Sequence, residues 1–470
     1  MHDSLTTQTS SHPAVAVVGL GKIGLPLAVQ YMGHGRRVIG CDINSLVVEK
    51  INAGQSHIQG EPGLDAGVAE AVHRGLLSAT VDVTGAISQA GVVVVIVPVV
   101  IDASHEVNFD AIDAATNAIG DGLRPGTLVI YETTLPVGTT AKRFGQMLEQ
   151  RAELKAGRDF HLAYSPERVK SGRIFHDLCA TPKVVGGIDE QSTGAAVAFY
   201  RSVLDAEIIT MASTEQAEFV KLIETAYRDV NIALANEFAR FADPRELDVV
   251  EAIAAANTLH ESHIHTPGVG VGGHCIPVYP YFLFSSLDEA HLRPQSPELP
   301  MLMLPRYARR INDSMAEYAL QRIEAEIGPL AQQAVLILGV AYRGNVHATA
   351  FTCAELLRDA LLAHGARVYV DDPLFSEEEL YALGYTPLPG ELEGEIRAII
   401  LQAAHTAYQS FDFSRFRSCQ VVFDGRNVLR REMLESLGMR YIAIGDGNYM
   451  RPTREHYEVD MTFSAPQRER

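Results

Sequence analysis

The stretch AVAVVGLGKIGLPLAVQYMGHGRRVIGCDIN, residues 14–44, decides the fold. A β-branched run leads into glycines spaced GxGxxG, then into apolar residues with helical spacing, then into a second β-branched run. Gly19 permits a tight turn, Gly21 lets a pyrophosphate approach the backbone, and Gly24 lets the helix pack on the strand. The helix N-terminus would face the phosphate charge. This order of strand, glycine turn, helix and strand predicts a dinucleotide-binding unit.

The second strand of this unit ends at Asp42. A carboxylate at this point can accept hydrogen bonds from an adenosine ribose, and it would repel a 2′-phosphate. Arg36 and Arg37 lie nearby, but they precede the strand. The predicted cofactor is therefore NAD rather than NADP.

Strand-like and helical segments alternate through most of the remaining chain, which predicts parallel, doubly wound sheets. The periodic stretch at 213–245 starts with the helix signal ST-x-E and contains Pro244 near its end, so we expect one long helix there. More helical sequence follows to about residue 325. The expected strands lie in the runs 92–98, 126–133, 160–167, 333–346, 366–373, 396–405 and 419–428.

The predicted fold class is thus α/β, with two Rossmann-like, doubly wound domains joined by a long central helix and a helical middle domain. The expected boundaries are a disordered tail at 1–13, an NAD-binding domain at 14–212, a central helical domain at 213–325, a C-terminal Rossmann-like domain at 326–458 and a tail at 459–470.

Composition narrows the class of partner. The 470 residues are 47% hydrophobic, enough to give several domains a core, and carry a formal charge of −19. Nucleic-acid binding is not expected, because nonspecific affinity for a phosphate backbone needs a basic face. The five cysteines are scattered and odd in number, which fits a reducing compartment. With no signal sequence or membrane span in view, a cytoplasmic protein without membrane partners is expected.

Cys275 lies in the glycine-rich run GVGVGGHCIPVYP, residues 268–280. Glycines leave the backbone without side-chain cover, so such a loop can present a thiol to a substrate. Adjacent His274 could lower the thiol pKa or only hydrogen bond locally. The other cysteines are expected to be small buried hydrophobes: Cys41, Cys179, Cys353 and Cys419.

A nicotinamide cofactor and a nucleophilic cysteine together suit one chemistry. An aldehyde can be captured as a thiohemiacetal, oxidised to a thioester and hydrolysed to an acid. Glu167 follows a strand-like run, at the sheet edge where doubly wound folds bind ligands, and it could be the base for hydrolysis or an acid at a helix start. Lys221 stands among apolar residues of the long helix and could stabilise an oxyanion.

A zinc site is the alternative for the histidines near Cys275. His260, His263, His265 and His274 are good ligand types, but HESHIH lacks the i, i+4 pair with a glutamate, and no second cysteine lies near Cys275. No metal is therefore predicted.

Over about residues 14–450 the chain resembles the nucleotide-sugar 6-dehydrogenase family, the relatives of UDP-glucose and UDP-N-acetylmannosamine dehydrogenases. Several independent motifs carry the resemblance in the family's order. They are VVGLGKIGLPLA (17–28), ETTLPVGTT (132–140), YSPERVKSG (164–172), KLIETAYRDVNIALANE (221–237), GVGGHCIP (270–277), ARRINDSM (308–315), LGVAYRGNV (338–346) and DDP (371–373).

The resemblance implies an NAD-dependent, four-electron oxidation of a nucleotide-linked hexose at C6, from alcohol to acid. By motif position Cys275 is the nucleophile, Glu167 the base for thioester hydrolysis, Lys221 the cation that stabilises oxyanions, and Thr134 a residue that helps to hold a water. The implied cofactor contacts are Gly19, Gly21, Lys22, Ile23, Gly24, Asp42 and Thr134. The implied substrate contacts are Glu167, Arg168, Lys221, Thr225, Arg228, Asn257, Gly268, Gly270, Gly272, Gly273, Tyr279 and Arg309.

SPERV and RDVNIALANE are more similar to the branch acting on UDP-N-acetylhexosamines than to the UDP-glucose branch. The resemblance also implies that the C-terminal domain binds the uridine diphosphate and that the long helix forms the core of a homodimer.

The chain departs from the family pattern at four positions. Tyr279 stands where the family usually has aspartate, and Thr225 where it has asparagine. In the C-terminal domain Ala348 and Ala350 replace an expected D-x-R pair. Catalysis is still favoured because Cys275, Glu167 and Lys221 are present, whereas the identity of the substrate is left open.

Three further hypotheses stay open beside a UDP-N-acetylhexosamine dehydrogenase. They are a UDP-glucose 6-dehydrogenase, a two-electron dehydrogenase of the 6-phosphogluconate or hydroxyacid type, and a noncatalytic NAD-binding relative. The two-electron hypothesis leaves Cys275 unexplained, and the intact nucleophile argues against the noncatalytic one.

Overall fold

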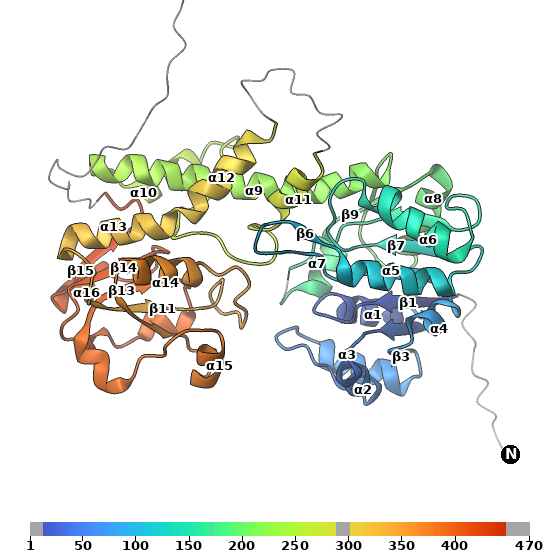
Figure 1. The fold of residues 1–470 in the computed structure, drawn as a ribbon, viewed down its shortest axis with the longest axis horizontal. Coiled ribbons are helices and arrows are strands. Elements are labelled where there is room, and N and C mark those ends of the chain that lie inside the picture. Colours follow the sequence, from blue (N-terminus) through green and yellow to red (C-terminus); the bar gives the residue numbers. More distant parts are fainter. Residues whose placement is uncertain (1–12, 171, 288–300, 448–470) are drawn as a thin grey trace, which may run out of the picture. The chain divides into compact units, whose positions relative to one another are not determined.

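The computed structural model describes residues 13–170, 172–287 and 301–447 (Figure 1). The chain divides into two compact units, Met1–Ala226 with Val278–Pro300, and Tyr227–Pro277 with Met301–Arg470. These divisions differ from the expected domain boundaries, which stay a prediction. The predicted tails lie outside the described residues, apart from Pro13.

The first unit is built on an eight-stranded sheet with the order β10-β9-β8-β7-β4-β1-β2-β3. All neighbouring strands are parallel except β8 and β9, which run antiparallel, so the predicted parallel sheet is right for all but that pair. The strands are β1 (Ala14–Val18), β2 (Val38–Cys41), β3 (Leu77–Thr80), β4 (Ala90–Val95), β7 (Leu128–Tyr131), β8 (His161–Tyr164), β9 (Lys183–Gly187) and β10 (Ile208–Thr210).

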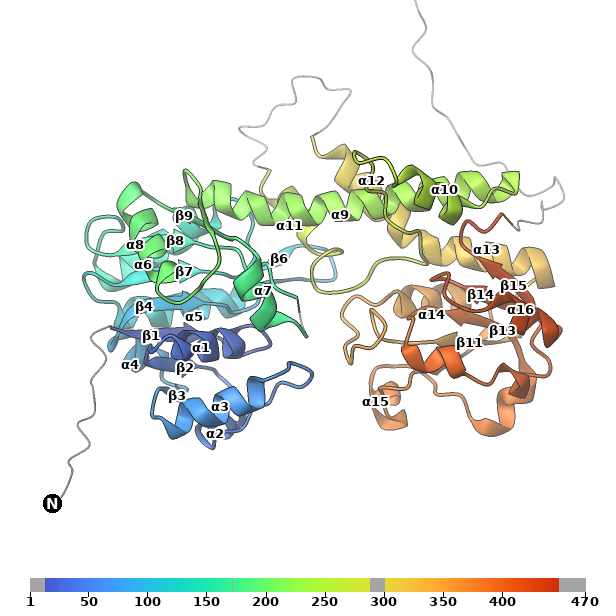
Figure 2. The ribbon, with the colours of Figure 1, turned by 180° about the vertical axis from the view of Figure 1, so that it is seen from behind.

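Helices cover both faces of this sheet, with α1, α7 and α8 on one side and α5 and α6 on the other (Figures 1 and 2). A short hairpin, β5 (Val100–Ile101) and β6 (Val107–Asn108), completes the unit. Its helices are α1 (Gly24–Gly33), α2 (Ser45–Asn52), α3 (Leu64–His73), α4 (Val83–Ile87), α5 (Asp110–Gly122), α6 (Gln146–Ala152), α7 (Ile174–Ala180), α8 (Glu190–Arg201) and α11 (Tyr279–Ser285).

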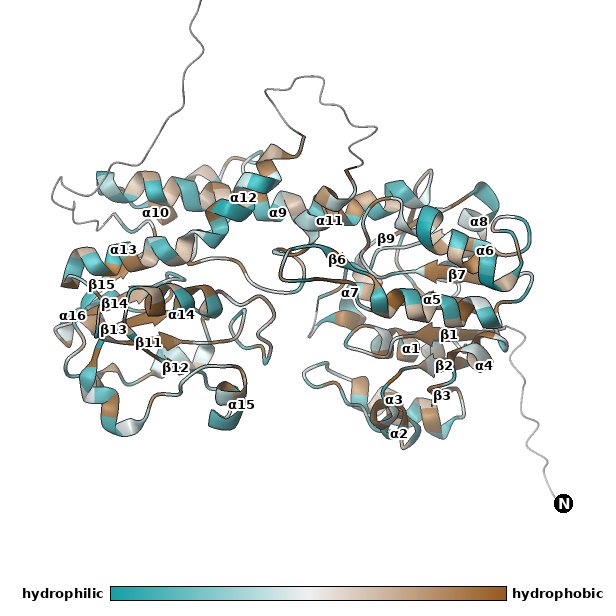
Figure 3. Ribbon diagram, viewed as in Figure 1, coloured by the Kyte–Doolittle hydropathy of each residue, from teal (hydrophilic) through white to brown (hydrophobic). Residues whose placement is uncertain are grey.

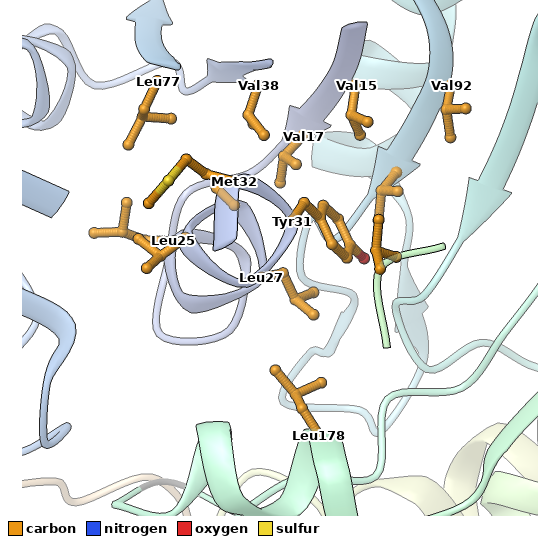
Figure 4. Packing of buried hydrophobic residues seen from close by; sticks show 14 of the residues in the cluster. Val15, Val17, Leu25, Leu27, Tyr31, Met32, Val38, Leu77, Val92 and Leu178 are labelled. Atoms are coloured by element: carbon orange, nitrogen blue, oxygen red, sulfur yellow. The ribbon is translucent and has the colours of Figure 1, made fainter. Parts of the chain in front are cut away.

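The main core of this unit lies between α1 and the sheet. Leu27 and Tyr31 of α1 pack near Val15 and Val17 of β1, and Leu178 of α7 closes the cluster from the other side (Figure 4). Burial of such side chains is the main favourable term in folding. The packing fixes the start of α1 against the end of β1, where the glycine turn lies.

The second unit contains a five-stranded, wholly parallel sheet with the order β12-β11-β13-β14-β15. Its central strands β11 and β13 are apolar and buried, and β11 is brown in Figure 3, which is typical of parallel sheets covered on both faces. The edge strand β12 is only partly buried. Its elements are β11 (Ala334–Leu338), β12 (Arg367–Asp371), β13 (Ile396–Leu401), β14 (Val421–Asp424), β15 (Arg440–Ala443), α10 (Val249–Ala256), α12 (Met303–Asp313), α13 (Met315–Ile327), α14 (Cys353–Ala363), α15 (Glu377–Ala382) and α16 (Arg431–Ser436).

The long helix is α9, Thr214–Ala242, with 29 residues (Figure 2). It ends where a 3₁₀ turn, Asp243–Arg245, takes over at Pro244, because proline disrupts a helix interior. The predicted single helix is therefore confirmed. No helix among the described residues is long and apolar enough to cross a membrane.

The cysteine predictions hold with one correction. Cys41, Cys353 and Cys419 are buried, and none of the five cysteines forms a disulfide. Cys179 is exposed rather than buried. It lies on α7, whose buried residues are Ile174, Asp177 and Leu178, so helical spacing turns Cys179 away from the core.

Candidate active site

The glycine turn after β1 has an open face and a crowded face. Gly19 has φ +96°, and a Cβ on Gly24 would lie 1.8 Å from the Gly19 carbonyl oxygen. A Cβ on Gly21 would meet nothing within 4 Å. Gly21 and neighbouring Lys22 are exposed, and Ile23 occupies the N-cap position of α1 without a side-chain hydrogen bond to the helix. The turn therefore presents bare backbone at a helix N-terminus, which suits a pyrophosphate.

Asp42 lies beside this turn. Its carboxylate accepts hydrogen bonds from the backbone N–H of Leu20 at 3.0 Å and of Asn44 at 2.9 Å. Each carboxylate oxygen has room for a second donor. Arg36, at the opposite end of β2, donates to Ser202 Oγ at 2.5 Å, so it is not placed to receive a 2′-phosphate.

We expect NAD to be used well ahead of NADP. NADP would lose a ribose hydrogen bond to Asp42 and gain charge repulsion, together about 2 to 4 kcal/mol, or roughly 30-fold to 1,000-fold in kcat/KM. Initial rates with the two cofactors measure this ratio. Equal kcat/KM values would contradict the role of Asp42.

Glu167 belongs to a buried cluster that the sequence did not predict. Lys183 Nζ donates to Glu132 Oε2 at 2.8 Å and to Glu167 Oε2 at 2.9 Å. Tyr31 and Tyr200 donate to Glu132 Oε1 at 3.2 and 2.5 Å. Two carboxylates thus share one ammonium group in the first unit.

The strand directions explain this meeting. Glu132 follows β7 and Glu167 lies just beyond β8, so both stand at the carboxyl edge of parallel strands. Lys183 is the first residue of β9, which is antiparallel to β8. The one antiparallel pair in the sheet therefore brings the start of β9 to this same edge.

The two carboxyl groups titrate differently. Burial alone would raise the pKa of Glu167, but Lys183 and the backbone N–H of Arg168 outweigh it and hold the pKa below its usual value. Burial raises the pKa of Glu132, despite Lys183, and the charge of Glu167 raises it further. Glu167 is accordingly the more acidic of the two carboxyl groups.

Lys221 and Arg168 also lie against this cluster. Lys221 Nζ donates to the backbone carbonyl of Glu167 at 2.6 Å. The Arg168 side chain forms an ion pair with Glu224 and donates to the Pro182 carbonyl at 3.0 Å. Two predicted site residues of separate motifs, Lys221 and Glu167, are therefore in contact.

Thr134 is buried. The residues that follow it, up to Thr140, are hydrogen-bonded to Glu218 of α9. Glu218 accepts hydrogen bonds from Gly138 N at 2.5 Å, from Thr140 N at 2.8 Å and from Thr140 Oγ1 at 2.7 Å. Burial raises the pKa of Glu218 to about 7. Glu218 and Lys221 are one helical turn apart, so the same stretch of α9 fixes this segment and carries the lysine.

Two of the four departures from the family pattern, Thr225 and Tyr279, lie in the first unit. The Thr225 hydroxyl donates to the Lys221 carbonyl at 3.1 Å, a bond made within the helix. Tyr279 begins α11, with its ring 5.4 Å from that of Phe282.

Cys275 is exposed and follows the glycine-rich loop of the second unit. The loop is packed closely on its own unit: a Cβ on Gly270 would meet Cys353 Sγ at 2.8 Å, and a Cβ on Gly272 would meet the Phe351 carbonyl at 2.8 Å. Gly273 N donates to the Ala350 carbonyl at 2.8 Å. The glycines are therefore needed for packing, and their contacts with substrate stay a prediction.

A buried polar cluster holds this loop. Asn236 on α9 accepts from Gly268 N at 2.9 Å and donates to Asn312 at 2.9 Å. Asp229 accepts from Arg309 at 2.6 Å and from Asn312 at 2.8 Å. Arg309, predicted as a substrate contact, is 3% exposed and part of this internal network.

Two other predicted substrate residues lie elsewhere on the second unit. Asn257 exchanges two hydrogen bonds of 2.8 Å with the backbone of Ile264, which closes a loop. Arg228 is exposed on α9. Among the described residues no group of three or more potential ligands is arranged for a metal ion.

A glycine turn at a helix N-terminus, an acid at the end of β2 and a buried carboxylate cluster at the same sheet define an NAD-dependent dehydrogenase. The sequence matches three domains of the UDP-glucose/GDP-mannose dehydrogenase family: the NAD-binding domain over residues 13–204, the central domain over 215–302 and the UDP-binding domain over 336–431. The chain belongs to this family, and the predicted resemblance is confirmed.

Individual proteins similar to this chain are named as nucleotide-sugar dehydrogenases. A UDP-N-acetyl-D-mannosamine dehydrogenase of Pyrococcus horikoshii is 35% identical over 448 residues, which cover 92% of this chain and 99% of the relative. A solved UDP-D-ManNAc dehydrogenase from the same organism has a TM-score of 0.82 at 33% identity, covering 93% of this chain and 100% of the other. An NDP-N-acetyl-D-galactosaminuronic acid dehydrogenase from Methanosarcina mazei has a TM-score of 0.81 at 29% identity, with coverages of 94% and 97%.

Proposed function

We propose that this protein oxidises C6 of a UDP-N-acetylhexosamine to the carboxylate, in two NAD-dependent steps. The observation that carries the proposal is an exposed Cys275 on a packed glycine loop, in a chain that matches a UDP-N-acetyl-D-mannosamine dehydrogenase over 92% of its length. A UDP-binding domain matches residues 336–431. The family match extends through the NAD-binding, central and UDP-binding domains, which favours an active enzyme over a noncatalytic relative.

The first stage forms an acyl enzyme. NAD, when bound at the glycine turn, accepts hydride in both oxidations. Loss of hydride from C6 and of the C6 hydroxyl proton to water gives the aldehyde. The Cys275 thiolate then adds to the aldehyde carbon, and loss of a second hydride from the alkoxide adduct leaves a thioester. Lys221 would stabilise oxyanions, because an ammonium held in place offsets developing negative charge.

The second stage releases the acid. Glu167 takes a proton from water, the water oxygen bonds to the thioester carbonyl carbon, and the carbon–sulfur bond breaks to return the thiolate. Thr134 would help to hold that water. We assign substrate contacts to Arg168, Thr225, Arg228 and Tyr279 on their motif positions.

The test is the number of NADH molecules formed per sugar nucleotide consumed. UDP-GlcNAc, UDP-ManNAc, UDP-GalNAc, UDP-glucose and GDP sugars would be compared, and a UDP-N-acetylhexosamine is expected to yield two NADH. One NADH would support a two-electron dehydrogenase, and none with any sugar a noncatalytic relative. Two NADH from UDP-glucose alone would overturn the substrate assignment.

We further propose a homodimer with α9 at its centre. Apolar positions on α9 form two adjacent faces: Leu222, Ala226 and Ala233 are buried, whereas the neighbouring stripe is largely exposed. This α9 stripe has the 3- and 4-residue spacing of one helix face. It comprises Phe219, Ile223, Tyr227, Val230, Leu234, Phe238 and Phe241. All are exposed except Val230, which is half-buried, and Tyr227 is 60% and Phe241 55% exposed.

Placing charges in the α9 stripe is expected to break the dimer. Ile223→Glu with Leu234→Glu would put two carboxylates into an apolar two-fold contact, and light scattering should then show a 51.2 kDa monomer. Leu362→Glu, an exposed leucine of α14, is the matched control and should leave the dimer intact. A monodisperse 51.2 kDa wild type at micromolar concentration would contradict the proposal.

We also propose a cytoplasmic location for this protein. The five cysteines are scattered along the chain and form no disulfide, which fits the reducing environment of the cytoplasm.

A further inference from the structure

Lys183 is a buried lysine for which the family motifs give no role. Its side chain is 6% exposed, its partner Glu132 is fully buried, and the side chain of its other partner, Glu167, is 10% exposed. An unpaired ammonium would be costly in such a place, so Lys183 must be paired to stay charged. Its Nζ lies 2.8 Å from Glu132 and 2.9 Å from Glu167.

The carboxylate of Glu167 is held on both oxygens. Oε1 accepts from the backbone N–H of Arg168 at 2.6 Å and of Val169 at 3.0 Å, while Oε2 accepts from Lys183. A carboxylate has about four acceptor positions, of which these donors fill three. The side chain is therefore fixed in one orientation, and Lys183 is the only one of the three donors that carries charge.

Glu132 holds Lys183 from the other side. Its Oε2 takes the second Lys183 bond, and its Oε1 is occupied by the hydroxyls of Tyr31 and Tyr200. Three elements thus anchor Glu132, and Lys183 bridges it to Glu167. A cavity of about 10 Å³ borders Glu167 and Lys183, near the least volume that holds one water.

We propose that Lys183 is a positioning residue that keeps Glu167 an oriented carboxylate for thioester hydrolysis, with Glu132 as the second carboxylate that keeps Lys183 in place. The proposal rests on the proposed function, because it concerns the base of that reaction. The proton still passes from water to Glu167, and Lys183 and Glu132 take no part in bond making.

Other charged or titratable groups surround Glu167, and they stay the same in each variant below. They are Lys221 and Glu224 on α9, Arg168 in the same loop, Asp177 on α7, Tyr31 on α1 and Tyr200 on α8.

The test is the pH dependence of acyl-enzyme decay, followed by quenching and intact-protein mass spectrometry. In the wild type the decay rate should fall as pH falls through the lowered pKa of Glu167. Lys183→Met removes the neighbouring positive charge, so this acid limb should move to higher pH by about 1 to 3 units. Glu132→Gln changes no charge over this limb, because the raised pKa of Glu132 leaves that carboxyl protonated where Glu167 titrates, so the limb should stay in place.

Lys183→Arg is the matched control, since it keeps the charge and should restore the wild-type pH limb. If Lys183 had only a structural role, Lys183→Met would lower the activity without shifting the acid limb of acyl-enzyme decay. That result would overturn the proposal. If Lys183→Met fails to bind NAD or to fold, Lys183→Gln decides, because it removes the same charge but keeps a polar end: an acid limb that does not move to higher pH overturns the proposal. Failure of the proposed function looks different, because the wild type itself would then form no thioester adduct.

Discussion

Cys275→Ser is expected to abolish the four-electron oxidation while leaving NAD binding intact. The hydroxyl of serine is a far weaker nucleophile than a thiolate at neutral pH, so no acyl enzyme can form. The glycine turn at Gly19–Gly24 belongs to the other compact unit, so the cofactor site is unchanged. NADH formation and intact-protein mass spectrometry, with cofactor affinity measured in parallel, report the two properties separately.

Cys179 provides the matched control for that substitution. It is the other exposed cysteine, and it lies in the same chain but outside every motif of the family. Cys179→Ser should therefore retain two NADH per substrate and the thioester adduct. Wild-type turnover by Cys275→Ala would contradict the assigned nucleophile and promote the two-electron or noncatalytic hypotheses.

The glycine turn after β1 could be predicted because the contacts that require it join residues close together in the sequence. Gly24 is required by contact with Gly19, five residues earlier, and both fall within one strand–turn–helix pattern. The end of α9 could likewise be predicted from Pro244. Such features depend on neighbours in sequence, which the sequence displays directly.

The buried cluster could not be predicted in this way. Lys183 heads the run KVVGG, which indicates only a buried strand. Its meeting with Glu132 and Glu167 depends on the order of β7, β8 and β9 and on the reversed direction of β9. The alternation of strands and helices along the sequence favours a wholly parallel sheet. In such a sheet the start of β9 would lie at the opposite edge from Glu132 and Glu167. Arg309 shows the same limit, since its motif position gave no sign of its internal partner Asp229.

Glu167→Gln is expected to separate the two chemical stages. The amide keeps the size of the side chain but cannot take a proton from water, so thioester hydrolysis should slow by ~10² to 10⁴-fold. Formation of the thioester at Cys275 does not need this base. The acyl enzyme should therefore accumulate in the presence of sugar nucleotide and NAD, and intact-protein mass spectrometry should detect its added mass.

The pH response distinguishes this loss from a general weakening of the enzyme. In the wild type Lys183 holds the pKa of Glu167 below the usual glutamate value, against the effect of burial, so hydrolysis should be lost only as pH falls through that lowered pKa. Glu167→Gln should remove that acid limb altogether, and Glu207→Gln, a change outside the cluster, should keep it. Normal kcat without a detectable adduct in Glu167→Gln would exclude Glu167 as the base, and with it the role assigned to Lys183, because an oriented carboxylate matters only if it accepts the proton.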